Sequence, residues 1–440
     1  MTTTLSISPM RLDFNNTLRL DRCWPEAPHG WQKYEAKEVK YASSGTEYIE
    51  KRRPECTVQF RRCQDYDNSF GFDWLRVGDT SETGCGWYRN CMDLNAYDQL
   101  VAAEYRSFSQ QWKQESEKYK ATSLYVIPWV TLMKGNTAKF RVKLEVNKPS
   151  GILDVKVIGR EATALSVNLT TIDAQQTGDY YNSMDLKVTC NTQFSSELAV
   201  EIRTEQELVG KMIFVPNTKT YSINIVLIPV KIVGANTPNV SSYTSNLSKY
   251  FKQAYVTPNF SVLNPALDLT KGSLVDIMTI NKKKEKRVIF DAYFRNNPEK
   301  RINTSNGIRT FKNAPDGLGG LDLYAFLDKM LCYQHPQFAS LLRNTYRLYC
   351  FDAEATAAGQ AEGIGESFAA AVFKTTSKCT PTHEILHCLG LRHTFDDKNK
   401  YLFRQYYTDN IMDYIPNDID SRNSLLYWQI KHIWNSLNQK

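Results

Sequence analysis

Three histidines and one glutamate lie within eleven residues of the sequence: His383, Glu384, His387 and His393. Residues four apart share one face of a helix, so His383 and His387 can direct their imidazoles at one metal ion. Glu384 is offset by about 100° around that helix, where it can act as a base rather than as a ligand. Because the whole chain has six histidines, such a cluster is rare by chance.

The flanking residues predict how the third histidine reaches the metal. Thr380 is a good N-cap and Pro381 suits the first helical position, so we expect a helix to begin just before His383. Gly390 can adopt a left-handed conformation, which would end the helix and bring His393 back as third ligand. Three protein ligands leave one position open, as is typical of a catalytic Zn²⁺.

The pattern H-E-x-x-H-x-x-G-x-x-H resembles that of the metzincin zinc metallopeptidases. Asn410-Ile411-Met412-Asp413-Tyr414 is similar to their Met-turn, in which the residue matching Met412 packs beneath the ligands and, like Gly390, supports the site. The stretch His393-Thr394-Phe395 is similar to the pappalysin-like branch. Tyr414 matches a tyrosine that stabilises the tetrahedral intermediate in some metzincins, and a buried structural tyrosine is the alternative interpretation.

The resemblance implies an α+β catalytic domain that hydrolyses peptide bonds by a zinc-activated water, with Glu384 as general base. It also implies a strand at the edge of the cleft that pairs with an extended protein or peptide substrate. The matching segment is 363–373, in which Phe368, Ala369 and Ala370 are the candidates for substrate contact. An ordinary buried strand is the alternative interpretation.

Three regions of the sequence differ in residue composition and in apolar–polar pattern, which predicts a multidomain protein. Residues 1–135 are rich in Trp, Tyr, Arg and Cys, and we assign them an N-terminal domain of unassigned fold with a helix from Asn95 to about Lys120. Residues 136–217 alternate apolar and polar side chains in five short runs, which predicts an all-β sandwich. Residues 218–440 mix strands and amphipathic helices and form the predicted metzincin-like domain.

Composition narrows the classes of partner. The net charge is +7, and the densest basic run, Lys282 to Arg287, is interpreted as a solvated loop, so no nucleic-acid partner is expected. No stretch of 18 apolar residues and no secretory signal are evident, so we expect neither a membrane span nor a signal peptide. Cys56, Cys63, Cys85 and Cys91 could pair or bind a metal, although buried free thiols are the favoured interpretation. Cys379 and Cys388 are expected to pack as small hydrophobic side chains.

The C-terminal arrangement also resembles metallopeptidase modules of bacterial secreted toxins and injection-system effectors. That resemblance implies a protein that is cytoplasmic in the producer and exported by a contractile injection route. The residues before 218, including 1–135, would have a loading or adaptor role, with a secretion-apparatus component and a cognate inhibitor as partners. Two alternatives stay open: a zinc amidase acting on cell-wall peptides, and a structural or binding component of a secretion particle with a vestigial peptidase domain.

Overall fold

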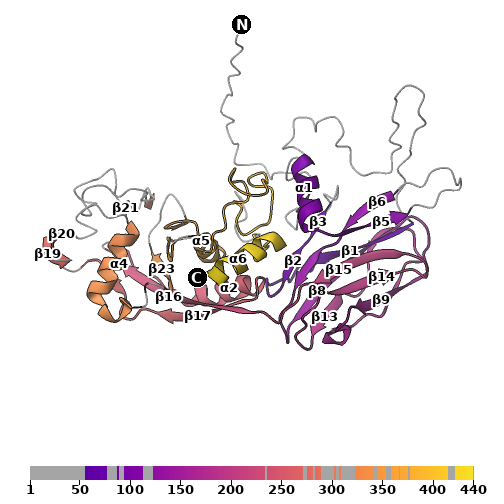
Figure 1. The fold of residues 1–440 in the computed structure, drawn as a ribbon, viewed down its shortest axis with the longest axis horizontal. Helices are drawn as coiled ribbons and strands as arrows, with labels where there is room; N and C mark the ends of the chain where they lie inside the picture. Colours follow the sequence, from indigo (N-terminus) through magenta and orange to yellow (C-terminus); the bar gives the residue numbers. More distant parts are fainter. Residues whose placement is uncertain are drawn as a thin grey trace, which may run out of the picture.

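The computed structural model of the protein describes residues 55–76, 94–111, 122–232, 235–270, 323–352, 358–414 and 422–439. Gaps of one or two residues interrupt 323–352 and 358–414, and short strands are described between residues 77 and 322. Two sheet-bearing parts lie side by side (Figure 1): a β-sandwich, and a C-terminal unit that extends from Tyr221 to Gln439. The architecture is therefore rich in sheets with few helices, as expected for a multidomain α+β protein.

The sandwich consists of two sheets that face each other across an apolar core. The order in the first sheet is β1 (Cys56–Arg62), β8 (Thr137–Val146), β13 (Leu186–Cys190) and β10 (Leu165–Val167), with β12 (Gly178–Tyr181) also paired to β8. The order in the second is β11 (Thr171–Asp173), β9 (Ile152–Ile158), β14 (Leu198–Arg203), β15 (Leu208–Phe214), β7 (Trp129–Thr131) and β2 (Gly71–Asp73). Alternate residues of β8 point inward, among them Phe140 and Val142, so the period-two pattern predicted these strands correctly.

The sandwich begins earlier than predicted. Strand β1 pairs with β8 along its whole length, and β2 pairs with β7, so strands from 55–135 lie in the same two sheets as those from 136–217. The predicted boundary near residue 135 therefore does not separate two folds. Strand β1 was not predicted because Arg61 and Arg62 are both buried in it, and two adjacent buried arginines interrupt the apolar–polar alternation.

The helix predicted from Asn95 to about Lys120 is too long. Helix α1 spans Leu94–Glu104, and the chain then forms β5 (Ser107–Gln111), which pairs antiparallel with β6 (Thr122–Val126). Pairing with the next strand overrides the local helical preference, and Phe108 stacks on Tyr125 across the pair. Residues 112–120 lie outside the part of the chain that the structure describes.

A mostly parallel sheet forms the centre of the C-terminal unit. Its order is β17 (Val256–Val262), β16 (Tyr221–Lys231), β23 (Tyr346–Phe351), β25 (Ala369–Val372) and β24 (Gly359–Ala361), with β18 (Leu267–Asp268) also paired to β16. Only β24 runs antiparallel to its neighbour. Helices α2 (Ser241–Lys252), α5 (Thr380–Cys388) and α6 (Tyr427–Gln439) pack on one face, and α4 (Leu323–Gln334) packs on the other.

The prediction that Phe368, Ala369 and Ala370 form a cleft-edge strand is wrong. The chain there forms β25, which is hydrogen-bonded to β23 on one side and to β24 on the other. An added peptide cannot pair with a strand whose two edges are already occupied. The small side chains instead face the two helical layers: Ala370 packs in the core with α5, and Ala369 packs in the core with α4.

The basic run predicted as a loop is also a strand. Residues Lys283–Val288 form β20, which pairs antiparallel with β19 (Val275–Ile280). In the register of this pair, Ile277 lies opposite Lys286. Two further pairs consist of two-residue strands: β3 (Leu75–Arg76) with β4 (Trp87–Tyr88), and β21 (Ile302–Asn303) with β22 (Gly307–Ile308).

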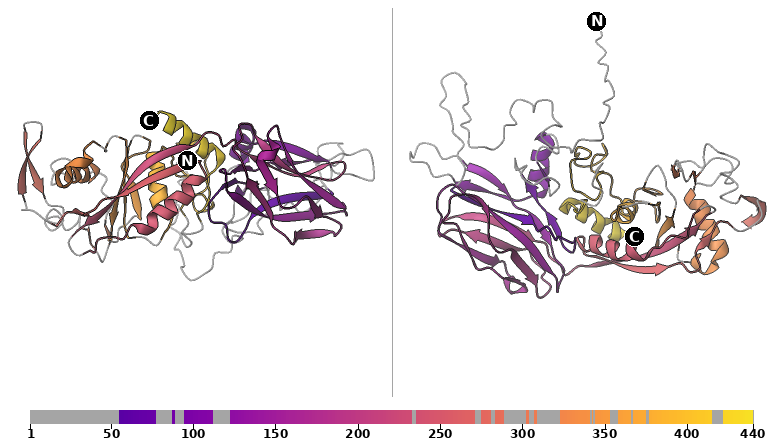
Figure 2. Two further views of the ribbon diagram at one scale, coloured as in Figure 1. Left: turned by 90° about the horizontal axis from the view of Figure 1, so that it is seen from below. Right: turned by 180° about the vertical axis from the view of Figure 1, so that it is seen from behind.

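The sandwich and the C-terminal unit share a buried core. Trp129 and Ile213 of the sandwich pack in one cluster with Tyr255, Leu426 and Tyr427 of the C-terminal unit. Helix α6 lies between the central sheet and the sandwich in two views of the molecule (Figure 2). The interface between the sandwich and the C-terminal unit therefore contains a continuous apolar cluster.

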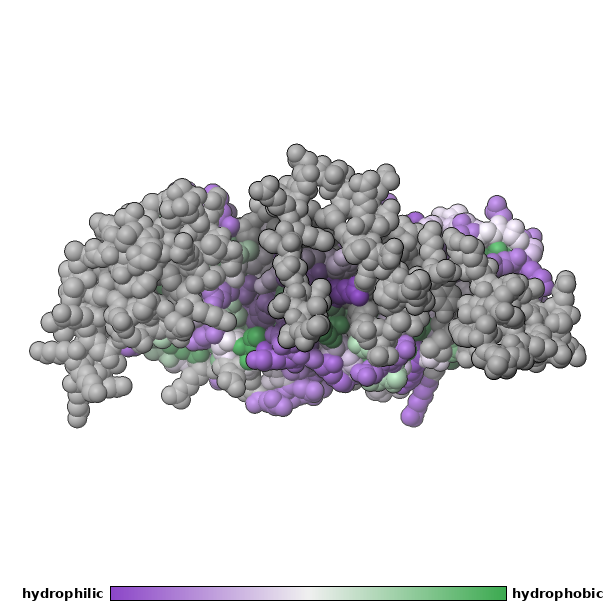
Figure 3. All heavy atoms as spheres, turned by 90° about the horizontal axis from the view of Figure 1, so that it is seen from above, coloured by the Kyte–Doolittle hydropathy of each residue, from purple (hydrophilic) through white to green (hydrophobic). Residues whose placement is uncertain are grey.

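None of the helices in the described ranges has the length and apolar character needed to cross a lipid bilayer. On the face drawn in Figure 3, hydrophilic residues and small hydrophobic areas are interspersed among the atoms that carry colour.

Candidate metal centre

Helix α5 begins at Thr380, one residue earlier than predicted, so Cys379 rather than Thr380 occupies the N-cap position. Every residue of α5 is buried between the central sheet and its neighbouring helices. Gly390 follows the helix with φ +96°, in the left-handed region. A Cβ at this position would also lie 2.6 Å from Nε2 of His432 on α6. Both the left-handed backbone and the close approach of His432 therefore favour glycine at position 390. The chain reverses direction at this residue and continues to His393.

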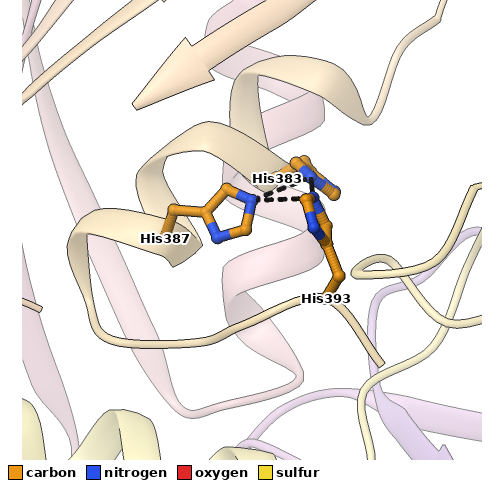
Figure 4. Close-up of side chains that lie close together, drawn as sticks. All are labelled: His383, His387 and His393. Atoms are coloured by element: carbon orange, nitrogen blue, oxygen red, sulfur yellow. Dashed lines mark hydrogen bonds between the residues drawn. The ribbon is translucent and has the colours of Figure 1, made fainter. Parts of the chain in front are cut away.

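The three histidines converge on one point. The Nε2 atoms of His383, His387 and His393 lie 3.1 Å from one another in every pair, and Figure 4 shows two rings from α5 facing the third from the following loop. Nδ1 of His383 is 2.7 Å from the carbonyl oxygen of Ile411, and Nδ1 of His387 is 2.7 Å from that of Leu391. Because a carbonyl only accepts hydrogen bonds, both Nδ1 atoms carry the proton and both Nε2 atoms present lone pairs.

Burial keeps these imidazoles neutral. It lowers the pKa of His387 to about 4 and that of His393 to about 3, and the pKa of His383 lies well below its ordinary value. Neutral rings whose lone pairs point at one another repel unless a cation lies among them. Three imidazole nitrogens in this arrangement fit a Zn²⁺ ion, which accepts three protein ligands at a catalytic site.

Glu384 lies beside this cluster and is almost fully buried. Burial raises the pKa of its carboxyl group to about 8, and the charge of Arg422 and a hydrogen bond from the backbone N–H of Ala361 act in the opposite direction. Strand β24 comes close because Gly359 has no side chain: a Cβ there would lie 2.7 Å from both Cγ and Oε1 of Glu384. A carboxyl group next to three imidazoles, held by an edge strand, is suitably placed for proton transfer.

Met412 and Tyr414 belong to the segment that follows the third histidine. Met412 is fully buried, and its carbonyl oxygen accepts a hydrogen bond from the backbone N–H of Thr394, 3.1 Å away. The hydroxyl oxygen of Tyr414 is 2.9 Å from Nε2 of His393, and 39% of the tyrosine is exposed. The alternative interpretation of Tyr414 as a buried structural residue disagrees with that exposure.

Arg422 was not identified from the sequence. It is buried, and it donates hydrogen bonds to the carbonyl oxygen of Asp413 (2.9 Å) and to Oγ of Ser377 (3.1 Å). Its charge opposes protonation of His383 and favours ionisation of Glu384. Arg422, Gly359 and Ala361 lie outside any repeated pattern, so no local signal could have identified them.

The cysteines closest to the cluster do not contribute ligands. Cys379 and Cys388 are fully buried, and the thiol of Cys388 donates to the carbonyl oxygen of Ala369, 3.4 Å away, in β25. Cys56 and Cys63 are free and buried, and burial raises the pKa of each thiol, to about 11 for Cys56 and to about 12 for Cys63. Cys85 and Cys91 lie outside the described residues.

Comparison with known proteins gives weak structural likenesses, among them the following two. Mature mirolysin of Tannerella forsythia, solved in complex with a cleaved peptide, is 12% identical with a TM-score of 0.28, over 49% of this chain and 91% of that one. A family 123 glycoside hydrolase from Clostridium perfringens is 8% identical with a TM-score of 0.15, over 51% of this chain and 53% of that one. No family model matches the sequence, and no curated protein matches it either.

Proposed function

We propose that the protein is a zinc-dependent endopeptidase. The observation that carries this proposal is the convergence of three Nε2 atoms 3.1 Å apart, two of them with their Nδ1 protons committed to carbonyl groups. His383, His387 and His393 would hold the ion. The adjacent buried Glu384 distinguishes this arrangement from a structural zinc site, which has four protein ligands and needs no base.

A zinc ion here would supply Lewis acidity, polarising the scissile carbonyl and making a nearby water more acidic. Glu384 takes the proton from the attacking water and returns it to the leaving amine. Its hydrogen bond from Ala361 fixes the carboxylate on the side of β24. Tyr414, whose hydroxyl group reaches the cluster, donates a hydrogen bond to the oxygen on which negative charge develops.

The substrate backbone would pair with β24 rather than with β25. Among the described strands, β24 is the last in the sheet and has a neighbour on one side only. Gly359 and Ala361 lie directly beside Glu384, so a peptide extended along this edge would pass the proposed base.

The test combines metal analysis with cleavage of a peptide library by the wild-type chain and by Glu384→Ala. We expect about one zinc per chain in both proteins, and turnover lower by about 10²–10⁴-fold in the variant. Glu205→Ala, which removes an exposed glutamate in the sandwich, is the control and should keep full activity. Undiminished cleavage by Glu384→Ala, or a wild-type chain that binds no zinc, would refute the proposal.

The amidase alternative and the toxin or effector role rest on the sequence alone and stay predictions. Hydrolysis of cell-wall fragments without cleavage of unfolded protein would favour the amidase. Zinc well below one per chain would favour a particle component with a vestigial domain. Absence of the protein outside a producer cell whose contractile machinery is active would contradict the effector role.

A further inference from the structure

A buried ion pair joins the sandwich to the C-terminal unit. Arg62 in β1 donates from Nη1 to Oδ2 of Asp409, a residue 347 positions away, and their side chains are 5% and 0% exposed. Nη2 of Arg62 donates to the carbonyl oxygen of Phe72 in β2, 3.1 Å away, which fixes the guanidinium within the sandwich. Since an arginine fork bound at two points has a defined orientation, Arg62 defines where Asp409 must lie.

Asp409 in turn clamps two segments of the C-terminal unit together. Its carbonyl oxygen accepts from the backbone N–H groups of Asn423 (2.7 Å) and Ser424 (3.1 Å), and its Oδ1 accepts from Oγ of Ser424 (2.9 Å). The backbone N–H of Ile411 donates to the carbonyl oxygen of Ser424, 2.9 Å away. The backbone from Asp409 to Ile411 is therefore held as one piece with residues 423–424.

This clamped backbone holds one of the histidines. The carbonyl oxygen of Ile411 accepts the Nδ1 proton of His383 at 2.7 Å, which fixes the tautomer and rotation of that ring. Partners that bind the outer nitrogen of a metal-bound histidine tune metal affinity through the orientation they impose. A continuous series of buried contacts thus leads from Arg62 through Asp409 and Ile411 to His383.

We infer that Arg62 is a positioning residue for the metal centre, which makes the sandwich an integral part of the catalytic unit. This inference rests on the proposed function, because it takes His383 to be a zinc ligand. It differs from the loading or adaptor role expected from the sequence, in which the residues before 218 would be separable from catalysis.

A second series of contacts, through Gln253, also connects the sandwich to the C-terminal unit near the metal centre. Oγ1 of Thr131 in β7 donates to the carbonyl oxygen of Gln253 at 2.6 Å. The side chain of Gln253 donates to the carbonyl oxygen of Asn423 (2.8 Å) and accepts from the backbone N–H of Leu425 (3.2 Å). The sandwich therefore contacts residues 423–425, the partner segment of Asp409, by way of Gln253 as well.

The experiment compares zinc affinity and the ligand-field spectrum of the Co²⁺-substituted full chain in four variants. Arg62→Met should weaken zinc binding by about 10–100-fold and change the spectrum, because His383 loses its fixed orientation. Arg62→Lys should lie between this variant and wild type. In Arg62→Met/Asp409→Asn no unpaired buried charge remains, so this double variant should fold while keeping the altered spectrum.

Arg61→Met is the matched control. Arg61 neighbours Arg62 in β1 and is equally buried, but it contacts Gln59, Phe60 and the ring of Trp74 in the sandwich. This control should bind zinc and cobalt as wild type does. Wild-type affinity and spectrum in folded Arg62→Met or in the double variant would overturn the inference, as would an equal loss in Arg61→Met. A wild-type chain that binds zinc but cleaves no peptide would count against the proposed function alone.

Discussion

The interior of the sandwich and the interior of the C-terminal unit differ in what they bury. The sandwich core is built mainly from aliphatic and aromatic side chains of alternating strands, with Phe140 and Val200 as fully buried examples, and its buried arginines, Arg61 and Arg62, lie in β1. Around α5 the C-terminal unit buries histidines, carboxylates, amides and an arginine: His383, Glu384, His387, Asp409, Asn410, Asp413, Arg422 and Gln429. Apolar packing tolerates exchanges that conserve volume, whereas each buried polar group needs a hydrogen-bonding or charged partner in a defined place. This difference indicates that the interior of the C-terminal unit contains the functional site.

The largest predicted effect concerns the apolar half of this contrast. Phe140→Ala removes a fully buried ring that contacts Phe60, Phe70 and Phe72 edge-to-face, so we expect the free energy of unfolding to fall by about 3–5 kcal/mol. Denaturant titration would measure the loss. Zinc affinity of the folded protein should not change at all. Ile152→Ala, at a side chain 52% exposed, is the control and should alter stability little.

A change among the buried polar residues around α5 should instead reduce zinc affinity. His387→Ala removes a proposed ligand, so zinc affinity should fall by more than the 10–100-fold typical of changes around a ligand. Isothermal titration with zinc would measure it. His335→Ala is the matched control, because His335 is a buried histidine of the same unit outside the cluster. Equal zinc binding by His387→Ala and wild type would remove the basis of the contrast.

A smaller effect should distinguish the positioning of the Glu384 carboxyl group from the binding of zinc. In Gly359→Ala the new Cβ would lie 2.7 Å from Cγ of Glu384, so the carboxylate must move. We expect peptide turnover to fall by about 10–100-fold with zinc affinity unchanged, since displacement of a catalytic group by about 1 Å costs that much. In the control Gly363→Ala the new Cβ would meet only Ser367, at 3.7 Å, and activity should persist. A turnover equal to wild type in Gly359→Ala would show that β24 does not constrain the base.

The smallest effect concerns the border between the two parts. Burial alone would raise the pKa of Glu104, but hydrogen bonds from Lys400, Lys431 and Tyr401 lower it below its ordinary value. A carboxyl with a lowered pKa stabilises the fold above about pH 4.5 and loses that contribution as the pH falls through its folded pKa. Glu104→Gln should cost about 1 kcal/mol at neutral pH and reduce the acid dependence of stability.

Thermal unfolding measured from pH 3 to pH 7 would test this prediction. Glu197→Gln is the control, because the pair between Glu197 and Arg106 is more exposed and should contribute less. An unchanged pH profile in Glu104→Gln would show that the polar border does not stabilise the protein.

The sequence predicted the parts of the fold that depend on local spacing. Alternation identified five of the seven strands between 137 and 203, and the four-residue spacing of His383 and His387 placed both rings on one helix. Gly390 has the left-handed backbone that the reversal to His393 requires. In each case, residues a few positions apart determine the outcome, so one sequence is sufficient.

Features that depend on distant pairing were missed. Buried arginines concealed β1, and the three residues of β24 are too few to show a pattern, so the edge strand was assigned to the segment of β25. Arg62 and Asp409 are 347 residues apart, and nothing near either residue indicates the other. Only the folded chain shows that the surroundings of the histidines include a strand of the sandwich.

The contact between Gly390 and His432 has a consequence for biosynthesis. Chains emerge from the ribosome from the N-terminus at roughly 5–20 residues per second, and early domains fold first. The sandwich can therefore assemble before the histidines are translated, whereas α6, which covers the reversal after α5, emerges only after them. A nascent chain would thus present its three imidazoles on an already folded platform while still lacking their cover. Binding of the proposed zinc ion should consequently be a late event in the maturation of each molecule.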